Sequence, residues 1–156
     1  MKQSRLSTIL FIVTLTLVGM WIPERFSYSP TRSLNYRFFF LDRAPNKAQL
    51  LNWAYIVFTI RSHYVPAGQE TSVKRVVCRG GDHLKVRQKD FFCNDQFLGK
   101  AKDLTLKGEK IVVFQYDGAI PTGQFFVMGT HPDSLDSRYV GFINENDIIA
   151  LAYPIV

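Results

Sequence analysis

Residues 119–141 read AIPTGQFFVMGTHPDSLDSRYVG and hold the most specific structural signal in the chain. The first part, through Gly123, completes a turn cluster that begins at Tyr116. Residues 124–128 (QFFVM) then form a short apolar run, which is typical of a buried strand. The sequence that follows is rich in small and polar residues, including Ser134, Asp136, Ser137 and Arg138. We therefore expect a strand that leads into a polar segment.

Period-two alternation and turn signals extend on both sides of this run and predict β structure. The expected strands cover residues 52–61, 73–77, 83–87, 110–115, 124–128 and 147–153. CRGGD (residues 78–82) is interpreted as a Gly-Gly turn between two of them. Only residues 45–51 indicate a short helix. No internal repeat or second boundary is visible, so residues 23–156 are predicted to form one mainly β domain.

The N-terminal segment differs sharply from the rest. Lys2 and Arg5 precede 17 uncharged residues, positions 6–22. At about 1.5 Å per residue these span roughly 25 Å, near the lower limit for crossing a bilayer. We expect residues 1–22 to be a cytoplasmic n-region and a single transmembrane helix, with the domain on the far side of the membrane. The alternative is a cleaved signal peptide, although VGMWIPERFS has no clear small-x-small site.

Composition limits the classes of function. The chain has 156 residues, a net charge of +6 and 47% hydrophobic residues, so a packed core is expected and disorder is not. A basic protein can bind nucleic acid, but no Lys/Arg block interleaved with aromatics is present, and a basic domain also suits an anionic bilayer. We predict a lipid bilayer rather than nucleic acid as a partner.

The two cysteines, Cys78 and Cys93, are 15 positions apart. In an oxidising compartment they could form a disulfide that staples a hairpin. The alternative is a pair of buried free thiols, since sequence alone does not show that their Cβ atoms meet.

Few residues offer chemistry on their own. The three histidines have no spacing that supports a Ser-His-Asp arrangement or a zinc site, and no phosphate-binding loop occurs, so no metal or cofactor is predicted. Ser33 lies in SPTRSLNYRFFFL, where a loop becomes a strand, and Lys74 lies in a valine-rich strand. A serine in such a loop is ordinarily a turn hydroxyl, and a lysine in a strand is ordinarily an exposed, solubilising residue. If Lys74 faced apolar neighbours, desolvation would lower its pKa and let the neutral amine activate a serine.

Two motifs carry a resemblance to type I signal peptidases, the S26 superfamily. SVKRVVCRGGD (residues 72–82) resembles their lysine box, and SLDSRYVG (residues 134–141) resembles their S-x-D-S-R-x-x-G signature. TRSLNYRFFFLD falls where these enzymes keep the nucleophilic serine. Within the superfamily, AIPTGQFFVMG is most similar to the conjugative-transfer, TraF-type peptidases that mature pilins. The resemblance implies a signal-peptidase-like β-barrel or sandwich.

The resemblance also implies roles. Ser33 matches the nucleophile and Lys74 the general base. Thr31 and the Ser33 backbone N–H match the oxyanion donors. Ser134 matches the hydroxyl that orients the lysine, whereas Asp136 and Arg138, beside Ser137, match a bracing ion pair. Asp136 has a more direct catalytic part in some relatives.

The sequence departs from the family pattern at three positions. Asn35 and Arg37 stand where a proline and a glycine are usual, and Gly80 stands where a proline is usual. These departures put the shape of the substrate cleft in doubt, and Arg37 is expected either to narrow the cleft or to meet an acidic group.

The resemblance predicts a membrane-anchored Ser-Lys endopeptidase of the bacterial inner membrane, with a periplasmic catalytic domain. Its substrate would be a membrane-embedded precursor, such as a conjugative pilin, cut after a small residue. Water or the substrate's own amine would resolve the acyl-enzyme, and the amine would make a cyclic product. Two alternatives remain: a non-catalytic scaffold of a pilus or secretion assembly, and a self-cleaving repressor, which would need a DNA-binding helix pair that residues 1–22 do not provide.

Overall fold

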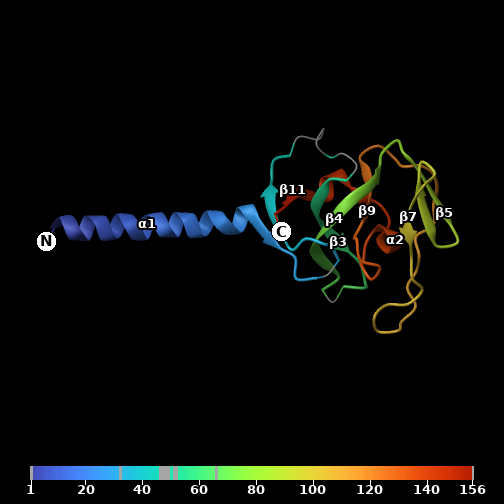
Figure 1. Cartoon of the computed structure of the whole chain (residues 1–156), viewed down its shortest axis with the longest axis horizontal. Coiled ribbons are helices and arrows are strands. Elements are labelled where there is room, and N and C mark those ends of the chain that lie inside the picture. The colour runs from blue at the N-terminus through green and yellow to red at the C-terminus, as the bar shows by residue number, and fades with distance from the viewer. Residues whose placement is uncertain (1, 32, 46–49, 51–52, 66, 156) are drawn as a thin grey trace.

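The structure, a computed structural model, describes residues 2–31, 33–45, 50, 53–65 and 67–155. It begins with one long helix, α1 (Lys2–Arg25), which projects from a β-rich domain (Figure 1). The predicted span of residues 6–22 lies inside α1, and the helix continues past position 23. Among the described residues, no helix reaches the combined length and apolarity of a candidate membrane span.

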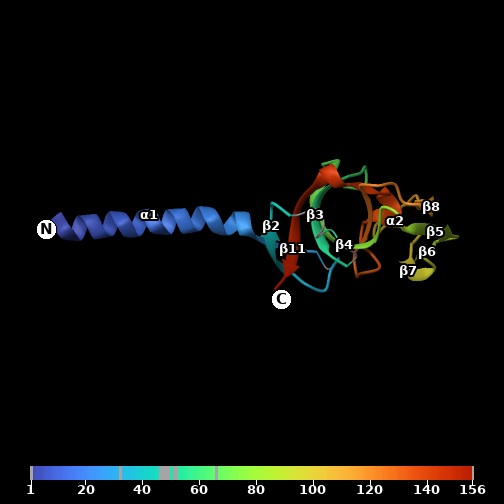
Figure 2. The same ribbon diagram turned by 90° about the horizontal axis from the view of Figure 1, so that it is seen from above.

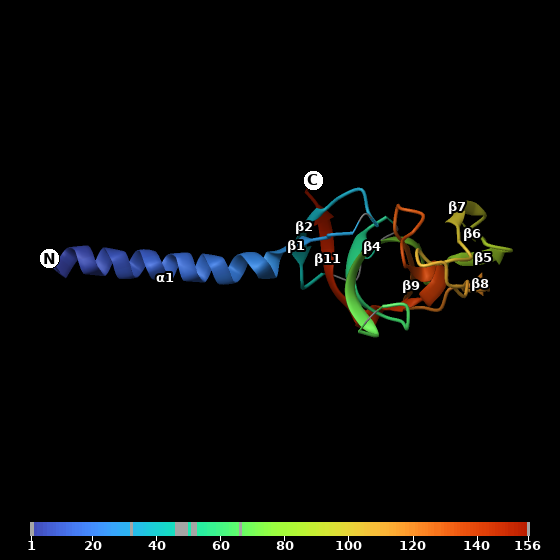
Figure 3. The ribbon, with the colours of Figure 1, turned by 90° about the horizontal axis from the view of Figure 1, so that it is seen from below.

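A seven-stranded antiparallel sheet forms the larger part of the domain, in the order β1-β2-β11-β3-β4-β9-β10. Its strands are β1 (Phe26–Tyr28), β2 (Phe38–Asp42), β3 (Tyr55–Arg61), β4 (Gln69–Arg79), β9 (Gln124–Met128), β10 (Ile143–Asn144) and β11 (Ile148–Pro154). The sheet curls strongly, and α1 leaves it beside β1, β2 and β11 (Figures 2 and 3). β11, the last strand of the chain, pairs antiparallel with β2, close to where the domain begins.

A second sheet of four strands, in the order β7-β6-β5-β8, lies at the end of the domain farthest from α1 (Figure 2). Its strands are β5 (His83–Arg87), β6 (Asp90–Cys93), β7 (Gln96–Lys100) and β8 (Asp117–Ala119). The mainly β class is confirmed. Neither sheet closes on itself within the described residues, so the barrel alternative was wrong: the fold is two open sheets.

The sequence pattern explains which faces are buried. In β2 the alternation of the aromatic run places Phe39 and Leu41 in the core and leaves Phe38 exposed. β9 is buried along most of its length, as expected of an apolar run covered on both faces. Phe58, Val76 and their neighbours fill the interior of the curled sheet. A separate cluster around Phe91 and Phe126 packs the second sheet against the first.

The glycine turn after Cys78 does not make a hairpin. β4 and β5 belong to different sheets, so Gly80 and Gly81 carry the chain from one sheet to the other. Cys78 and Cys93 form a disulfide. Because Cys78 is on β4 and Cys93 on β6, the bond links the two sheets, which corrects the expectation that it staples a hairpin.

Residues 110–115 are not a strand, which corrects another prediction. Only Lys110 makes a bridge, to Leu104. The following backbone amides donate to unrelated partners: Val112 to the Tyr64 hydroxyl and Phe114 to the Arg138 carbonyl. This segment is apolar because it covers the core, not because it pairs in a sheet. The helix predicted over residues 45–51 falls largely outside the described residues.

Two short helices lie between β9 and β11. α2 (Ser137–Val140) follows the polar segment after β9, and the 3-10 helix η2 (Glu145–Asp147) leads into β11. The side chain of Asp136 caps α2 by accepting a hydrogen bond from the Arg138 amide. The segment that carries the S-x-D-S-R sequence is therefore pinned directly after β9.

Candidate active site

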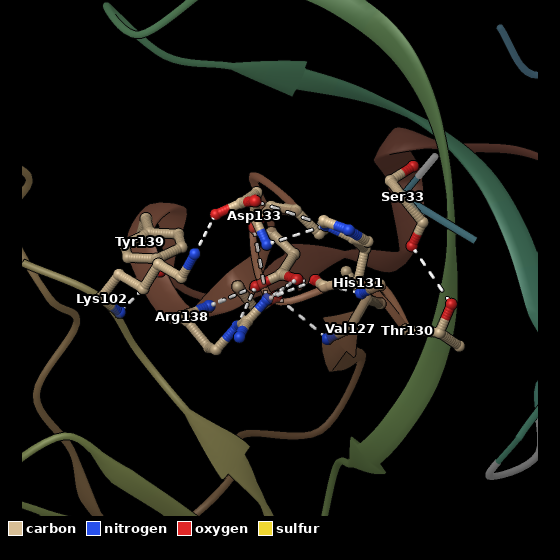
Figure 4. A network of polar contacts seen from close by, with 12 residues as sticks. Ser33, Lys102, Val127, Thr130, His131, Asp133, Arg138 and Tyr139 are labelled. Carbon is tan, nitrogen blue, oxygen red and sulfur yellow. Dashed lines mark hydrogen bonds and ion pairs between the residues drawn. The ribbon is translucent and has the colours of Figure 1, made fainter. Parts of the chain in front are cut away.

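Ser33 lies in the loop between β1 and β2. Its carbonyl oxygen accepts hydrogen bonds from the amides of Thr130, at 2.8 Å, and His131, at 3.3 Å. Its hydroxyl lies 2.9 Å from the hydroxyl of Thr31. Figure 4 shows the Ser33 loop beside the segment that follows β9. Backbone contacts to that segment thus fix the position of Ser33, while its side chain remains at the surface of a cavity.

Lys74 is buried in the middle of β4, with 4% of its surface exposed. It pairs in register with Ile56 of β3 and shares a strand face with Val76. Burial lowers the pKa of Lys74, and the nearby Arg138 lowers it further. The carboxylates of Asp136 and Glu70 oppose this shift but do not cancel it. The lysine is therefore on an apolar face and deprotonates more readily than an exposed one.

Ser33 and Lys74 line the same cavity, of about 510 Å³. Its lining comes from four parts of the chain: the described residues between Ser27 and Ser33, the beginning of β4 over residues 70–74, Leu106, and His131 with residues 133–135. Thr31 and Ser134 also line it. Four of the predicted site residues, separated by as much as 103 positions (134 − 31), therefore meet at one hollow.

Ser134 is buried at this cavity, and its hydroxyl has no hydrogen-bond partner among the described residues. Leaving a buried hydroxyl unpaired costs free energy, so such a group in a cavity is available to a bound molecule or to a side chain that moves. Gly129 lies directly against it. A Cβ at position 129 would clash with the Ser134 side chain and come within 2.6 Å of the Ser33 carbonyl oxygen.

Asp136 and Arg138 form a fully buried ion pair beneath the cavity. The guanidinium donates from Nε to one carboxylate oxygen at 2.9 Å and from Nη2 to the other at 2.8 Å. Burial lowers the pKa of Arg138, but the hydrogen bonds and charge of Asp136 outweigh it and raise that pKa overall. Neither residue lines the cavity.

The ion pair also braces the surrounding backbone. Asp136 accepts from the Gly129 amide at 2.9 Å, and Arg138 donates to the Lys100 carbonyl at 2.9 Å. Ser137 accepts from the Val127 amide at 3.0 Å. These bonds tie the S-x-D-S-R segment to β9 and β7, and they hold the wall of the cavity.

Of the three departures from the family pattern, those at Asn35 and Gly80 have local explanations in the structure. Asn35 accepts a hydrogen bond from the Thr130 hydroxyl at 3.0 Å, which adds a tie between the Ser33 loop and the segment after β9. Gly80 donates its amide to the Gln124 carbonyl at 2.9 Å, a bond that proline would lose. Arg37 is exposed and is not among the residues that line the cavity.

Sequence reasoning missed several residues of the site. Thr130 and His131 hold the Ser33 carbonyl, and Asp133 lines the cavity. The ring of His131 accepts from the Asp133 amide at 3.2 Å, and Asp133 is paired with Lys102 (Figure 4). Their hydrogen bonds are local or cross between loops, so no periodic pattern marks them.

Metal-ligand groups do not gather at this site within the described residues. The cluster of potential ligands is Cys78, Asp82 and Cys93, and both sulfurs are bonded to each other. Beside its hydroxyls and the Lys74 amine, the cavity presents the carboxylates of Glu70 and Asp133 and the ring of His131.

A family model described as signal peptidase, peptidase S26, matches residues 4–156. The chain therefore belongs to the peptidase S26 family and is a serine protease of the signal peptidase I type. The family assignment rests on this match, which spans α1 and the whole β domain.

Among solved structures, the chain is similar to a signal peptidase I from Enterococcus faecalis V583. The two are 22% identical, and the match covers 65% of this chain and 94% of that chain, with a TM-score of 0.43. No curated protein sequence gives a significant match.

Proposed function

We propose that this protein is a Ser-Lys endopeptidase in which Ser33 is the nucleophile and Lys74 the general base. The observation that carries the proposal is that both side chains line one cavity, with Lys74 buried on an apolar strand face and its pKa lowered. A serine hydroxyl is a weak nucleophile unless a base takes its proton. A buried lysine amine with a lowered pKa can supply that base.

In the proposed reaction, the Ser33 Oγ attacks the carbonyl carbon of the scissile peptide bond while Lys74 Nζ accepts the Oγ proton. The Ser33 backbone N–H and the Thr31 hydroxyl, 2.9 Å from Ser33 Oγ, stabilise the oxyanion. Lys74 then donates the proton to the leaving amine as the C–N bond breaks, which leaves an ester on Ser33. A second nucleophile attacks that ester, again with Lys74 as base.

The remaining site residues act through this dyad. The unpaired Ser134 hydroxyl can accept a hydrogen bond from the Lys74 amine and so aim its lone pair at Ser33. Asp136 and Arg138 position the segment that carries Ser134. We assign Asp136 a positioning and electrostatic role, because its carboxylate raises the pKa of Lys74 from outside the cavity.

The proposed substrate is a membrane-embedded precursor whose signal or pro-segment ends in a small residue. The resemblance of residues 119–129 to TraF-type peptidases supports a conjugative pilin as that precursor. If the cavity excludes water when the precursor binds, the substrate's own N-terminal amine can resolve the ester and give a cyclic product. Otherwise water resolves it and the product is linear.

We propose that α1 attaches the enzyme to the bacterial inner membrane, with the β domain in the periplasm. Residues 6–22 carry no charge, and large apolar side chains along the helix, such as Leu10 and Phe11, are exposed. Exposed aromatics at the helix end of the domain, including Phe26, Tyr28 and Phe38, extend this apolar surface. The cavity begins at residues 27–30, directly after α1, where an embedded substrate would emerge.

Co-expression with candidate pilin precursors, followed by intact mass measurement, tests the proposal. We expect processed product with the wild type and only intact precursor with Ser33→Ala or Lys74→Ala. A cyclic product would be one water, about 18 Da, lighter than the linear product. Unimpaired processing in either variant would reject the Ser-Lys assignment and favour a scaffolding role in pilus assembly.

A further inference from the structure

A second cavity, of about 620 Å³, adjoins the one that holds Ser33 and Lys74. Its walls come from the loop at residues 63–65, from residues 102–111 and from residues 132–135. Four residues line both cavities, namely Leu106, Asp133, Ser134 and Leu135. The two cavities thus adjoin along the segment that carries Ser134.

The walls of the second cavity are held in place without a ligand. The Tyr64 hydroxyl accepts from the Val112 amide at 2.9 Å, which ties the two outer walls together. The Tyr139 hydroxyl accepts from the Lys102 amide at 3.0 Å, and Lys102 pairs with Asp133 (Figure 4). Since pre-formed clefts lose less conformational entropy on binding, this one is suited to receive a chain.

The accessible lining of the second cavity combines leucines with charged side chains. Leu104 is 52% exposed and Leu106, at the tip of the loop between Lys102 and Ile111, is 84% exposed. Leucines held at the rim of a cavity gain stability when a partner removes them from water. At the junction of the two cavities, the buried Ser134 hydroxyl lacks a partner among the described residues.

The charges around the second cavity leave a small positive excess. Lys102 is paired with Asp133, which leaves Lys107 and Lys110 against Glu109. These side chains are exposed, so their effect is screened and modest. An apolar chain with an acidic residue fits this lining better than a basic one.

The position of α1 indicates which cavity the proposed substrate meets first. The first cavity includes residues 27–30, which directly follow the helix, and the second includes none of them. A precursor whose upstream segment lies in the membrane beside α1 enters the first cavity from that side. Its chain beyond the scissile bond then leads past Ser134 into the second cavity.

We propose that the second cavity binds the substrate segment on the leaving-group side of the scissile bond, with Leu104 as a specificity contact. This inference rests on the proposed Ser33–Lys74 peptidase activity. The occupant is an extended, mainly apolar polypeptide segment of the precursor. The enzyme thereby reads residues of the mature product as well as the small residue before the cut.

Two synthetic peptides test this with the full chain in detergent. Both carry the same apolar segment ending in Ala-x-Ala before the scissile bond. One has a single residue after the bond, and the other has about six, roughly 20 Å of extended chain. We expect the long peptide to have the lower KM. Leu104→Gln should raise KM for the long peptide about fivefold and leave kcat and the short peptide unchanged.

The matched control is Val112→Gln, one residue beyond Ile111, where that loop ends. Val112 is 73% exposed but lines neither cavity, so this variant should behave as the wild type with both peptides. Equal KM values for the two peptides, or an equal effect of Leu104→Gln on both, would overturn the second-cavity assignment while Ser33-dependent cleavage persists. Absence of Ser33-dependent cleavage of both peptides would instead overturn the proposed function and, with it, this inference.

Discussion

Lys74 sits where a charged side chain is least favourable, buried on an apolar face of β4 beside Ile56 and Val76. This position has a catalytic and an energetic consequence. The folded chain binds a proton at Lys74 less tightly than the unfolded chain, whose lysine pKa is about 10.4. The Lys74 contribution to stability therefore rises with pH only between its lowered pKa in the folded chain and the unfolded value, a range in which the folded chain holds the free amine.

The first residue-scale prediction concerns pH. Processing should fall as pH drops through the lowered pKa of Lys74, because the protonated amine cannot accept the Ser33 proton. The pH dependence of kcat/KM for the free enzyme measures this. A flat profile from about pH 6 to about pH 10, a range that brackets lowered lysine pKa values, would contradict the assignment of Lys74 as base.

The second concerns stability. Lys74→Met removes the amine but keeps an unbranched side chain only one atom shorter, so we expect no processing together with a Tm that rises by a few degrees. Each unit by which burial depresses a lysine pKa corresponds to about 1.4 kcal/mol at neutral pH. Differential scanning calorimetry decides the matter, and a clearly lowered Tm would mean that Lys74 stabilises the fold.

The third concerns the buried ion pair. Arg138→Met leaves the Asp136 carboxylate buried and unpaired, and should cost about 3–5 kcal/mol in the free energy of unfolding. Arg61→Met breaks an exposed pair with Asp147, of 2.8 Å, and should cost at most about 1 kcal/mol. Urea denaturation of both variants compares them directly. Similar losses in the two would refute a bracing role for the buried pair.

At the scale of elements, the sequence predicted β9 and much of β3, β4, β5 and β11, because their apolar and β-branched runs reflect burial directly. The strand predicted over residues 110–115 is absent. These residues are apolar because several of them pack on the core, but their backbone does not pair in a sheet. The sequence analysis did not predict β6 and β7, which are joined by a short turn at Asn94 and Asp95. Both turn residues have positive φ. Which strands share a sheet depends on long-range pairing that period-two patterns do not encode.

Some residues of the site could likewise be predicted from the sequence, whereas the contacts that hold them could not. Ser33, Lys74 and Ser134 could be named from motifs, and they do line one cavity. The contacts that hold them, such as Thr130 to the Ser33 carbonyl and Gly129 against Ser134, arise only when two distant segments meet. The second cavity likewise depends on the loop after Lys102, which has no motif.

Gly129 gives an element-scale prediction, since it lets β9 end against the Ser33 loop. Gly129→Ala should displace that loop, lower kcat strongly and cost about 1–3 kcal/mol, because the new methyl group would clash with backbone and side chain. Gly19→Ala in α1 is the control, with nothing within 4 Å of the added Cβ. Steady-state kinetics of the two variants test this, and an unchanged kcat in Gly129→Ala would show that the contact is not needed.

The disulfide gives another, because it joins the two sheets. Reduction should add about 2 Da to the intact mass and cost about 3 kcal/mol, the value typical of a loop of about 15 residues. Chemical denaturation with and without reductant measures the cost. A reduced protein with an unchanged midpoint would mean that core packing alone holds the sheets together.

At the scale of the whole molecule, a long helix and a β domain meet beside β1, β2 and β11 (Figure 3), and the lining of the Ser33 cavity begins at Ser27, two residues after α1 ends. This arrangement brings the proposed nucleophile near the surface to which α1 would bind. A substrate held in the same membrane reaches the site after a short length of extended chain. If α1 anchors the enzyme as proposed, cleavage takes place close to the bilayer.

The membrane role of α1 can be tested on the full chain. Leu10→Lys with Leu15→Lys should abolish co-sedimentation with phosphatidylglycerol vesicles, because each lysine at the centre of a membrane helix costs about 2.5–3.5 kcal/mol. Leu10→Ile with Leu15→Ile should bind as the wild type. Both leucines are exposed, so the β domain should keep its Tm in either variant. Full vesicle binding by the lysine variant would argue against α1 as the anchor.

The most direct measurement of the central claim is to trap the acyl-enzyme. The full chain is mixed with the precursor found by co-expression, quenched in acid within one turnover, and mapped by peptide mass spectrometry. We predict an ester-linked substrate fragment on Ser33 in the wild type and no adduct in Lys74→Met. An adduct on another residue, or an adduct on Ser33 that forms equally fast without Lys74, would contradict the account.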